Sequence, residues 1–380
     1  MEHRSVKRLV LAGGGSAHVE VLRSFALQRA PEVEITLVTP YPSFTYSGMI
    51  TGHFAGDYEL DDLVVDVRAL ASRAGAEVVL ATASLVDGRR RELFCSNGTV
   101  LPYDVLSLDV GSMTSVDTVA GVAERAFAVR PLERLVKAFN DILVRGREGH
   151  MAVVTIVGGG AASVELALTM NHRFRRELFE VATHVRVVAD TPHLVPELSA
   201  GARRRLLRHM ERHGVEWQVG SAVAEVGDGY LRLANGLTFS TDAVIWATGA
   251  AAQPWIAQSG LACDDRGFML TNDLLQSPSH PEIFGAGDCV NELGRPLPKA
   301  GVFAVRAAPV LAHNLRAALE GGPTQPFVTK RDYLALISTG GRHAVGNYGR
   351  WGFGGRWAWH WKDRIDRRFI ARYREAMLPR

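Results

Sequence analysis

The chain has 380 residues and the composition of an ordinary globular protein, with 47% hydrophobic and 22% charged residues. Its net charge of +3 is too small to indicate a nucleic-acid-binding protein, and its three cysteines lie too far apart for a disulfide framework or a local cysteine-based metal site. We therefore expect two or three domains with large cores, no metal site and no nucleic-acid partner.

The first predicted strand ends in three consecutive glycines. The stretch LVLAGGGSAHVEVL contains an apolar run, then Gly13, Gly14 and Gly15, then a helix-like pattern. Such a turn lets backbone N–H groups approach a pyrophosphate at the start of the helix. His18 stands where the third glycine of this fingerprint is expected, so it either contacts the ligand or packs inside. The next predicted strand ends in Thr39 instead of the usual acidic ribose ligand.

A second unit of the same kind follows, so the chain contains an internal repeat. The stretch VTIVGGGAASVELA carries Gly158 and Gly160, with Ser163 at the third glycine position. The next predicted strand, VRVVAD, offers Asp190 as a ribose ligand that is displaced by one residue. The repeat predicts two nucleotide-binding units, or one such unit and a second that has lost its ligand.

Each unit continues with an Asn-Gly pair, Asn97-Gly98 in the first and Asn235-Gly236 in the second. Asn-Gly between alternating runs predicts a β-hairpin with a type I′ turn. Each hairpin leads into an apolar strand that ends at Gly111 or Gly249, at the same distance from its Asn-Gly pair. This shared continuation strengthens the repeat.

A third glycine turn, EIFGAGDCV, contains Asp288 and precedes a long helix-like run. We interpret the second unit as an insertion in the first. The expected fold is α/β, with two Rossmann-like, three-layer dinucleotide-binding domains and a small C-terminal region. The predicted boundaries are 1–119 and 263–325 for the first domain, 120–262 for the second, and 326–380 for the C-terminal region.

The C-terminal region is aromatic and basic. Apolar residues recur there at four-residue steps: Trp357, Trp361, Ile365, Phe369, Tyr373 and Met377. Between them lie several arginines. This pattern fits a helix at the surface of an anionic membrane, or an amphipathic helix that packs on its own domain or on a twin subunit. Both interpretations, and a homodimer, stay open.

Several of these stretches resemble one protein family. They are GGGSAHVEVLRSFA, PYPSFTYSGMITGHFAG, YDVLSLDVGS, GGGAASVELAL, PEIFGAGDCV, PKAGVFAVRAAPVLAHNL and WKDRIDRRFIARY. They resemble the FAD-dependent pyridine nucleotide-disulfide oxidoreductases, and within them the branch of type II NADH dehydrogenases and sulfide:quinone oxidoreductases. The chain is most similar to the flavoprotein module that some bacteria fuse to selenophosphate synthase (selenide, water dikinase).

The resemblance implies two cofactors and a set of residues for each. For FAD these residues are Gly13, Gly14, Gly15, Gly111, Asp288, Val302 and Phe303, to which the fingerprint positions add His18 and Thr39. For NADH or NADPH they are Gly158, Gly160 and Gly249, to which the strand-end position adds Asp190. Glu165 and Lys299 are the implied catalytic residues, Glu165 near the contact of nicotinamide and flavin and Lys299 beside the isoalloxazine. Hydride would pass from the nicotinamide to flavin N5.

The electron acceptor stays open between a quinone and a small selenium or sulfur species. No cysteine pair stands against the flavin motif, and the run GVFAVRAAP carries Arg306 where type II NADH dehydrogenases have glutamines. Two alternatives remain: a flavoprotein that oxidises a small molecule directly beside a vestigial NAD domain, and a non-catalytic flavin redox sensor or partner module. We expect a cytoplasmic protein, or one peripheral on the inner face of the membrane.

Overall fold

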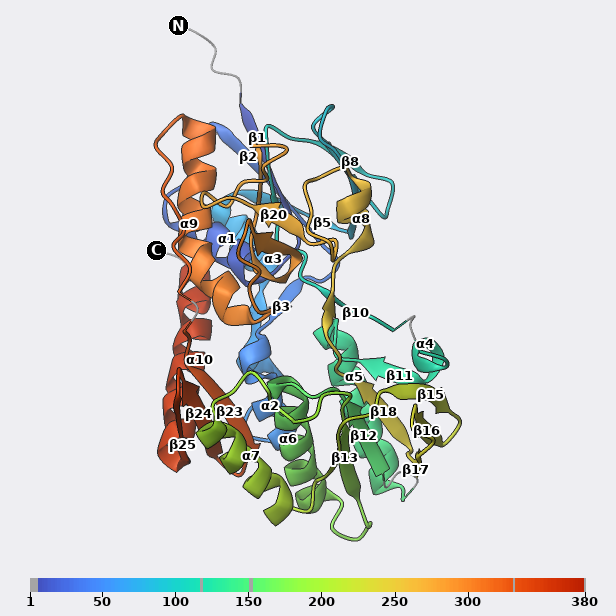
Figure 1. Cartoon of the computed structure of the whole chain (residues 1–380). Coiled ribbons are helices and arrows are strands. Elements are labelled where there is room, and N and C mark those ends of the chain that lie inside the picture. Colours follow the sequence, from blue (N-terminus) through green and yellow to red (C-terminus); the bar gives the residue numbers. More distant parts are fainter. Residues whose placement is uncertain (1–5, 117–118, 150–152, 331, 379–380) are drawn as a thin grey trace, which may run out of the picture.

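The computed structural model describes residues 6–116, 119–149, 153–330 and 332–378, and it shows two α/β domains, one above the other (Figure 1). The first domain contains a five-stranded parallel sheet in the order β21-β9-β1-β2-β5. Its strands are β1 (Lys7–Ala12), β2 (Val33–Thr39), β5 (Ala76–Leu80), β9 (Val105–Leu108) and β21 (Ile283–Gly285). The strand order reverses between β1 and β9, which is where open α/β sheets bind their ligands.

This sheet is the middle one of three layers. Helices α1 (Ser16–Leu27), α3 (Val67–Ala74) and α9 (Gly301–Glu320) cover one face. On the other face lie α8 (Pro254–Gln258) and the antiparallel sheet of β6 (Ala83–Asp87), β7 (Glu92–Cys95) and β8 (Val100–Pro102). Strands β1 and β9 are covered on both faces, which explains why LVLA is a continuous apolar run and why VLSL is apolar except for Ser107.

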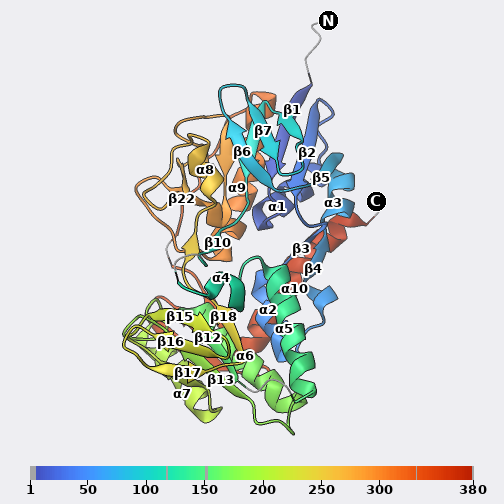
Figure 2. The same ribbon diagram turned by 90° about the vertical axis from the view of Figure 1, so that its right-hand side faces the viewer.

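The second domain repeats this plan, as the internal repeat predicts. Its parallel sheet has the order β11-β18-β12-β13-β14. The strands are β11 (Ala126–Ala128), β12 (Val153–Val157), β13 (His184–Val188), β14 (Glu216–Gln218) and β18 (Ala243–Trp246). Figure 2 shows this sheet between helices α5 (Leu132–Arg147) and α6 (Ala161–Glu177) and the antiparallel strands β15 (Val223–Gly227), β16 (Tyr230–Leu233) and β17 (Thr238–Ser240).

Both Asn-Gly hairpins are present, but the predicted type I′ turn is wrong. Only the glycines, Gly98 (φ +85°) and Gly236 (φ +87°), have positive φ, whereas a type I′ turn requires it at both central residues. Each loop has three residues, and its closing pair bonds through Cys95 N to Thr99 O (2.9 Å) or Leu233 N to Leu237 O (2.8 Å). In each loop the side-chain oxygen of the asparagine accepts a hydrogen bond from the backbone N–H two residues later, which stabilises the three-residue loop.

Two short strands carry the chain between the domains. Strand β10 (Met113–Thr114) leads out, β19 (Ala250–Ala251) leads back, and the two pair antiparallel. Helix α8 follows β19, and its Trp255 and Ile256 belong to the core of the first domain. The return crossing therefore comes before α8, ahead of the predicted boundary at residue 262.

A second connection is made by α2 (Ser47–Ala55), which leaves the first domain and packs on α6. The ring centroids of Phe54 in α2 and Phe139 in α5 lie 4.3 Å apart. The remaining elements are helix α7 (Ala200–Arg212) and the short elements β3 (Ser43–Thr45), η1 (Leu60–Leu63), β4 (Val64–Asp66), α4 (Val122–Arg125), β20 (Met269–Thr271), η2 (Gly287–Cys289) and β22 (Val290–Glu292).

The C-terminal region is a three-stranded antiparallel sheet and one long helix. The strands are β23 (Ala335–Gly340), β24 (His343–Tyr348) and β25 (Trp351–Gly355), and the helix is α10 (Arg356–Met377). Helix α10 packs on this sheet and on α1 and α3 of the first domain (Figure 1). Among the described helices, none is both long and apolar enough to span a membrane.

The predicted apolar stripe of this helix divides between two faces. Phe369 and Tyr373 are buried, whereas Trp357, Trp361 and Ile365 are exposed. The buried face instead follows a three- and four-residue spacing through Ala358, Trp359, Lys362, Asp366, Phe369, Ile370 and Tyr373. Helix α10 thus packs on its own domain and still presents aromatic rings to solvent.

Candidate functional site

The first glycine turn leaves no room for side chains. Gly13 has φ +99°, and a Cβ there would lie 2.2 Å from the carbonyl oxygen of Asp109. A Cβ on Gly14 would lie 2.8 Å from Oγ1 of Thr39, which is buried at the end of β2. Only glycine permits this close approach, so the turn presents bare backbone at the start of α1.

His18, the residue at the third glycine position, is fully buried. Its Nδ1 lies 2.7 Å from the carbonyl oxygen of Gly13 and its Nε2 lies 2.8 Å from Oγ of Ser107. A carbonyl only accepts, so Nδ1 carries the proton and Nε2 accepts from Ser107. Burial lowers the pKa of His18 to about 4, so the ring is neutral. Because both ring nitrogens are hydrogen-bonded within the protein, the structure favours a packing role for His18 over contact with a ligand.

Asp109 caps helix α1 and is absent from the sequence-based candidates. Its Oδ2 accepts hydrogen bonds from the backbone N–H groups of Ala17 (2.8 Å) and His18 (3.2 Å). Gly15, the N-cap residue, has no side chain that could do this. Burial raises the pKa of Asp109 to about 7, although the two N–H groups oppose the shift. The DVG stretch that contains it is visible in the sequence, but only the fold brings it to α1.

A second residue missed by the sequence analysis is Arg130, which lies two residues before α5 of the second domain. Its Nη2 lies 2.8 Å from Oδ2 of Asp288 in η2, and its Nη1 donates to Oγ of Ser112. Arg130 therefore reaches from the second domain to the third glycine turn, which belongs to the first domain and contains Asp288. The sequence around Arg130 contains no motif from which this contact could be predicted.

These residues fit the pyrophosphate and sugar portion of FAD. The glycine turn offers backbone N–H groups, and Arg130 supplies a positive charge at the same end of the sheet. Gly111 follows β9 at the strand-order reversal, with φ +68°, and among the described residues nothing lies within 4 Å of the place of its Cβ. The first glycine turn thus offers backbone donors, Arg130 offers a positive charge, and Gly111 leaves open space, all at the carboxyl end of the sheet.

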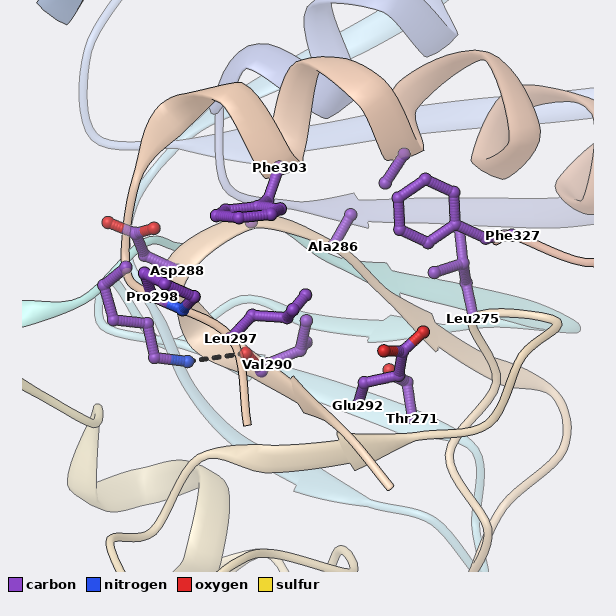
Figure 3. A pocket seen from close by; sticks show the side chains of 13 residues that line it. Thr271, Leu275, Ala286, Asp288, Val290, Glu292, Leu297, Pro298, Phe303 and Phe327 are labelled. Atoms are coloured by element: carbon purple, nitrogen blue, oxygen red, sulfur yellow. Dashed lines mark hydrogen bonds between the residues drawn. The ribbon is translucent and has the colours of Figure 1, made fainter. Parts of the chain in front are cut away.

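A small cavity lies beside this path, under the first turns of α9 (Figure 3). Asp288 and Phe303 line it, together with Leu297, Val290 and Glu292. Phe303 is buried and meets Tyr333 edge to face, with ring centroids 5.5 Å apart. The structure thus brings Asp288 and Phe303 together, as the resemblance implies. Val302, next to Phe303, lies in the first turn of α9.

Lys299 also lines this cavity, but its amine is held on the protein. Nζ donates to the carbonyl oxygen of Val290 (2.6 Å) and to Oδ1 of Asn291 (2.8 Å), and it lies 3.7 Å from the ring centroid of Phe268. Burial lowers its pKa to about 8. These contacts favour a role in fixing the turn before α9.

The second glycine turn has the same shape as the first. Gly158 has φ +139°, and a Cβ there would lie 2.3 Å from the carbonyl oxygen of Ala247. Gly160 is the N-cap of α6 and has no side-chain cap of its own. Asp190 is exposed two residues after the end of β13, and among the described residues nothing lies within 4 Å of the place of a Cβ on Gly249. These four residues line the carboxyl end of the second sheet.

Glu165 lies in the first turns of α6 and is half-buried. Its Oε1 accepts from Oγ1 of Thr51 in α2 (2.9 Å) and from the backbone N–H of Ser338 in β23 (2.7 Å). Burial raises the pKa of Glu165. The carboxylate therefore joins the second domain to α2 and to the C-terminal sheet.

Beside Glu165 lies a buried lysine that the sequence analysis also missed. Nζ of Lys362 in α10 donates to Oδ2 of Asp366 at 2.6 Å and to the carbonyl oxygen of Gly48. Burial lowers the pKa of Lys362, but Asp366 and Glu165 together hold it above its usual value, so the amine stays charged. Glu165 and Lys362 are thus parts of one buried polar network between α2, α6 and α10.

The cysteines of the protein are isolated from one another in sequence, at positions 95, 263 and 289. Within the described ranges, no group of three or more His, Cys, Asp or Glu side chains has the arrangement of a metal site. Cys95 and Cys289 are buried and Cys263 is half-buried, and all three are free.

Comparisons with known proteins agree with this geometry. The family model of the pyridine nucleotide-disulphide oxidoreductases matches residues 7–313. A probable NADH dehydrogenase of Dictyostelium discoideum is 22% identical over 364 residues, which cover 88% of this chain and 79% of the relative. A type II NADH:quinone oxidoreductase of Staphylococcus saprophyticus is 23% identical, over 90% of each chain.

Two solved structures have the same fold. The sulfide:quinone oxidoreductase of Aquifex aeolicus superposes with a TM-score of 0.79 at 16% identity, over 97% of this chain and 92% of its own. NDH2 of Plasmodium falciparum, solved with NADH, gives a TM-score of 0.78 at 14% identity, over 97% of this chain and 98% of its own. The predicted α/β fold and the predicted superfamily are confirmed. The finer likeness to the module fused to selenophosphate synthase stays a prediction.

Proposed function

The chain belongs to the pyridine nucleotide-disulphide oxidoreductase family, and we propose that it passes electrons from NAD(P)H through FAD to a quinone. It is an oxidoreductase, with FAD and NAD(P)H as its cofactors. The observation that carries the proposal is the pair of dinucleotide folds, each with a glycine turn at the reversal of its strand order. A quinone is supported by the relative named as an NADH:quinone oxidoreductase.

The first domain would bind FAD, which supplies the hydride acceptor and the electron donor of the reaction. The turn at Gly13 to Gly15 binds the pyrophosphate through backbone N–H groups, with Arg130 as the positive charge. Helix α9 begins at Gly301, so its N-terminus adds positive partial charge near Phe303. In this proposal Lys299 positions the turn before α9, and Glu165 positions the second domain against α2 and the C-terminal sheet.

The cysteines disfavour sulfur chemistry as the route to the acceptor. Sγ of Cys289 is fully buried and donates to the carbonyl oxygen of Ala286 at 3.3 Å. Burial raises its pKa to about 12, so the thiol stays protonated and is a poor nucleophile at neutral pH. A disulfide or persulfide relay requires a reactive thiolate beside the flavin, whereas reduction of a quinone requires none.

The experiment that tests this function is an anaerobic titration of the FAD-loaded protein with NADH and then NADPH, followed by the visible absorption of the flavin. Bleaching at stoichiometric nucleotide, and recovery on addition of a soluble quinone, would support the proposal. A flavin that dithionite reduces but neither nucleotide reduces would exclude the NAD(P)H donor. Direct oxidation of a small molecule, or a sensor role, would then be favoured.

A membrane contact is a second candidate, because α10 and β25 present an aromatic surface that consists of Trp351, Phe353, Trp357, Trp361 and Ile365. The three tryptophans are 77%, 56% and 43% exposed in chain order. The ring of Phe353 stacks on Trp357 and Trp361, with centroids 5.1 and 6.2 Å away. Tryptophan is typical of the interface between lipid and water.

Exposed arginines, Arg350, Arg356, Arg364 and Arg368, accompany this aromatic surface in sequence. Aromatic anchors with adjacent positive charge fit an anionic lipid surface. In this proposal the protein binds the membrane peripherally, where a lipid-soluble quinone is available. Packing on a second copy of the chain is the alternative.

A further inference from the structure

A carboxylate of the protein already caps the helix that starts the second nucleotide site. Oε1 of Glu197 accepts a hydrogen bond of 2.7 Å from the backbone N–H of Ala161. Ala161 is the first residue of α6, directly after Gly160. The first N–H groups of such a helix are the ones that bind the pyrophosphate of a dinucleotide. Glu197 thus uses a donor for which a pyrophosphate would compete.

Glu197 reaches this place because the segment after β13 folds back over the glycine turn. The backbone N–H of Val195 donates to the carbonyl oxygen of Gly159 at 2.6 Å, and that of Gly220 donates to Thr191 O at 3.0 Å. Val195 is fully buried and has φ +47°, which is uncommon for a β-branched residue. The backbone is therefore anchored, and the exposed side chain of Glu197 is the part that is free to turn away.

The surroundings of Glu197 place it toward the first domain as well. The pKa of Tyr333 is raised, first by burial and second by the charge of Glu197. Tyr333 in turn packs on Phe303, which belongs to the flavin motif. Within the described ranges no cation forms an ion pair with Glu197. Among the described residues, its negative charge is therefore balanced by the N-terminus of α6 and by no side-chain cation.

We propose that Glu197 is an internal competitor of NAD(P)H, whose carboxylate caps α6 in the free protein and is displaced when the pyrophosphate binds. This inference rests on the proposed use of the second domain for NAD(P)H. An N–H donor and the positive end of a helix stabilise an anion, but two anions at one donor repel each other. The displacement therefore lowers the affinity for the dinucleotide below that of a bare glycine turn.

The test is the binding of ADP-ribose, which carries the pyrophosphate but no nicotinamide, to the oxidised FAD-loaded protein by calorimetry. Glu197→Ala should bind about fivefold tighter than the unchanged protein, because a cap interaction of ordinary strength no longer has to be broken. Glu197→Gln keeps an acceptor oxygen without the charge and should show a smaller gain. Glu211→Gln, an exposed glutamate of α7, is the matched control and should bind unchanged.

Thermal stability, measured without NAD(P)H or ADP-ribose, is a second readout, and in it the substitution should be unfavourable, whereas it favours binding. Glu197→Ala should lower the thermal midpoint of the FAD-loaded protein, measured without NAD(P)H or ADP-ribose, by about 2 °C, because α6 loses its cap. Tighter binding together with lower stability in the absence of ligand would support the proposal.

Two results would count against it, and they are distinguishable. Equal or weaker binding of ADP-ribose by Glu197→Ala, with binding by the unchanged protein, would overturn this inference and leave the proposed function intact. No binding by any variant would overturn the use of the second domain for NAD(P)H, and this inference with it.

Discussion

The guanidinium of Arg130 in the second domain lies 2.8 Å from the carboxylate of Asp288 in the first. Arg130 belongs to the segment between β11 and α5, and Asp288 follows the third glycine turn. One ion pair thus connects the segment before α5 to the glycine turn that would face FAD. Because the side chains are 33% and 18% exposed, the pair is only partly screened by water.

Arg130→Ala should weaken FAD retention about tenfold and lower stability by about 1 kcal/mol, because Asp288 is left without its cation near a bound pyrophosphate. Arg130→Lys keeps the charge but loses the planar fork, and an intermediate effect is expected. Fluorescence of released flavin during dialysis measures the retention. Arg145→Ala, at an exposed position on α5, is the control. Equal flavin loss in both alanine variants would contradict the role of Arg130.

Asp109 predicts a pH dependence of stability and of FAD binding. Its pKa is about 7 in the folded protein against 3.8 for an ordinary aspartate, and burial is the main cause. Between these values the folded state holds a proton that the unfolded state has lost, so stability falls as pH rises from about 4 to 7. The loss is on the order of 1.4 kcal/mol for each pKa unit.

Asp109→Asn removes this titration and should flatten the pH profile while the amide oxygen still caps α1. FAD affinity of the unchanged protein should also decrease above pH 7, where Asp109 is charged and repels the pyrophosphate. Denaturant unfolding and flavin binding between pH 5 and 8 measure both effects. A variant and parent with parallel profiles would show that Asp109 is not the titrating group.

His18 should act in the acidic range with the opposite slope. Its pKa is about 4 in the folded protein and 6.5 for an ordinary histidine, because burial disfavours the charged ring. The unfolded state therefore binds the extra proton between these values, and stability falls as pH drops from 6.5 to 4, by on the order of 3 kcal/mol. His18→Gln should reduce this acid sensitivity in urea unfolding at pH 5. Unchanged sensitivity would mean that other histidines carry it.

Much of the fold follows from local patterns, because glycine turns and apolar strands are set by nearby residues. The repeat around Gly13 and Gly158 predicts two dinucleotide folds, and both are present. The Asn-Gly pairs predict the hairpins correctly and their turn type wrongly, since Asn97 has a negative φ in a three-residue loop. A dipeptide does not determine the length of the loop that closes around it.

The contacts between distant segments are the part that the sequence analysis missed. Arg130 and Asp288 stand far apart in the chain, as do Asp109 and Ala17. In each pair the two residues are brought together by the tertiary fold, and each residue alone resembles an ordinary surface charge or strand end. The stripe on α10 was predicted from four-residue steps, but packing on two surfaces rotates the buried face toward Lys362 and Asp366.

Substitutions of Glu165 can separate a role in positioning the second domain from a role in hydride transfer. Glu165→Gln keeps an oxygen that accepts from Thr51 and Ser338 but removes the charge beside Lys362. If the residue positions the second domain, the rate of flavin reduction by NADH should stay within about threefold, and Glu165→Ala should destabilise by about 2 kcal/mol. Stopped-flow absorbance and thermal unfolding measure the two. A large rate loss in Glu165→Gln with normal stability would instead assign it to the chemistry.

The aromatic surface predicts selective binding to anionic lipid. The pair of substitutions Trp357→Ser and Trp361→Ser removes the two exposed rings of α10 without touching its buried face. Partition of the protein onto vesicles that contain phosphatidylglycerol should fall at least tenfold, because each tryptophan contributes roughly 1 kcal/mol or more at a lipid interface. Vesicles of phosphatidylcholine alone should bind the unchanged protein more weakly.

Solution turnover with NADH and a soluble quinone serves as the control and should be unaffected, because both rings lie on the outer face of α10. Light scattering of the unchanged and substituted proteins separates membrane binding from self-association. If the unchanged protein is a dimer that the substitutions convert to a monomer, and neither form binds vesicles, then the aromatic surface is an interface between copies of the chain. Retained vesicle binding after the substitutions would place any membrane contact elsewhere on the protein.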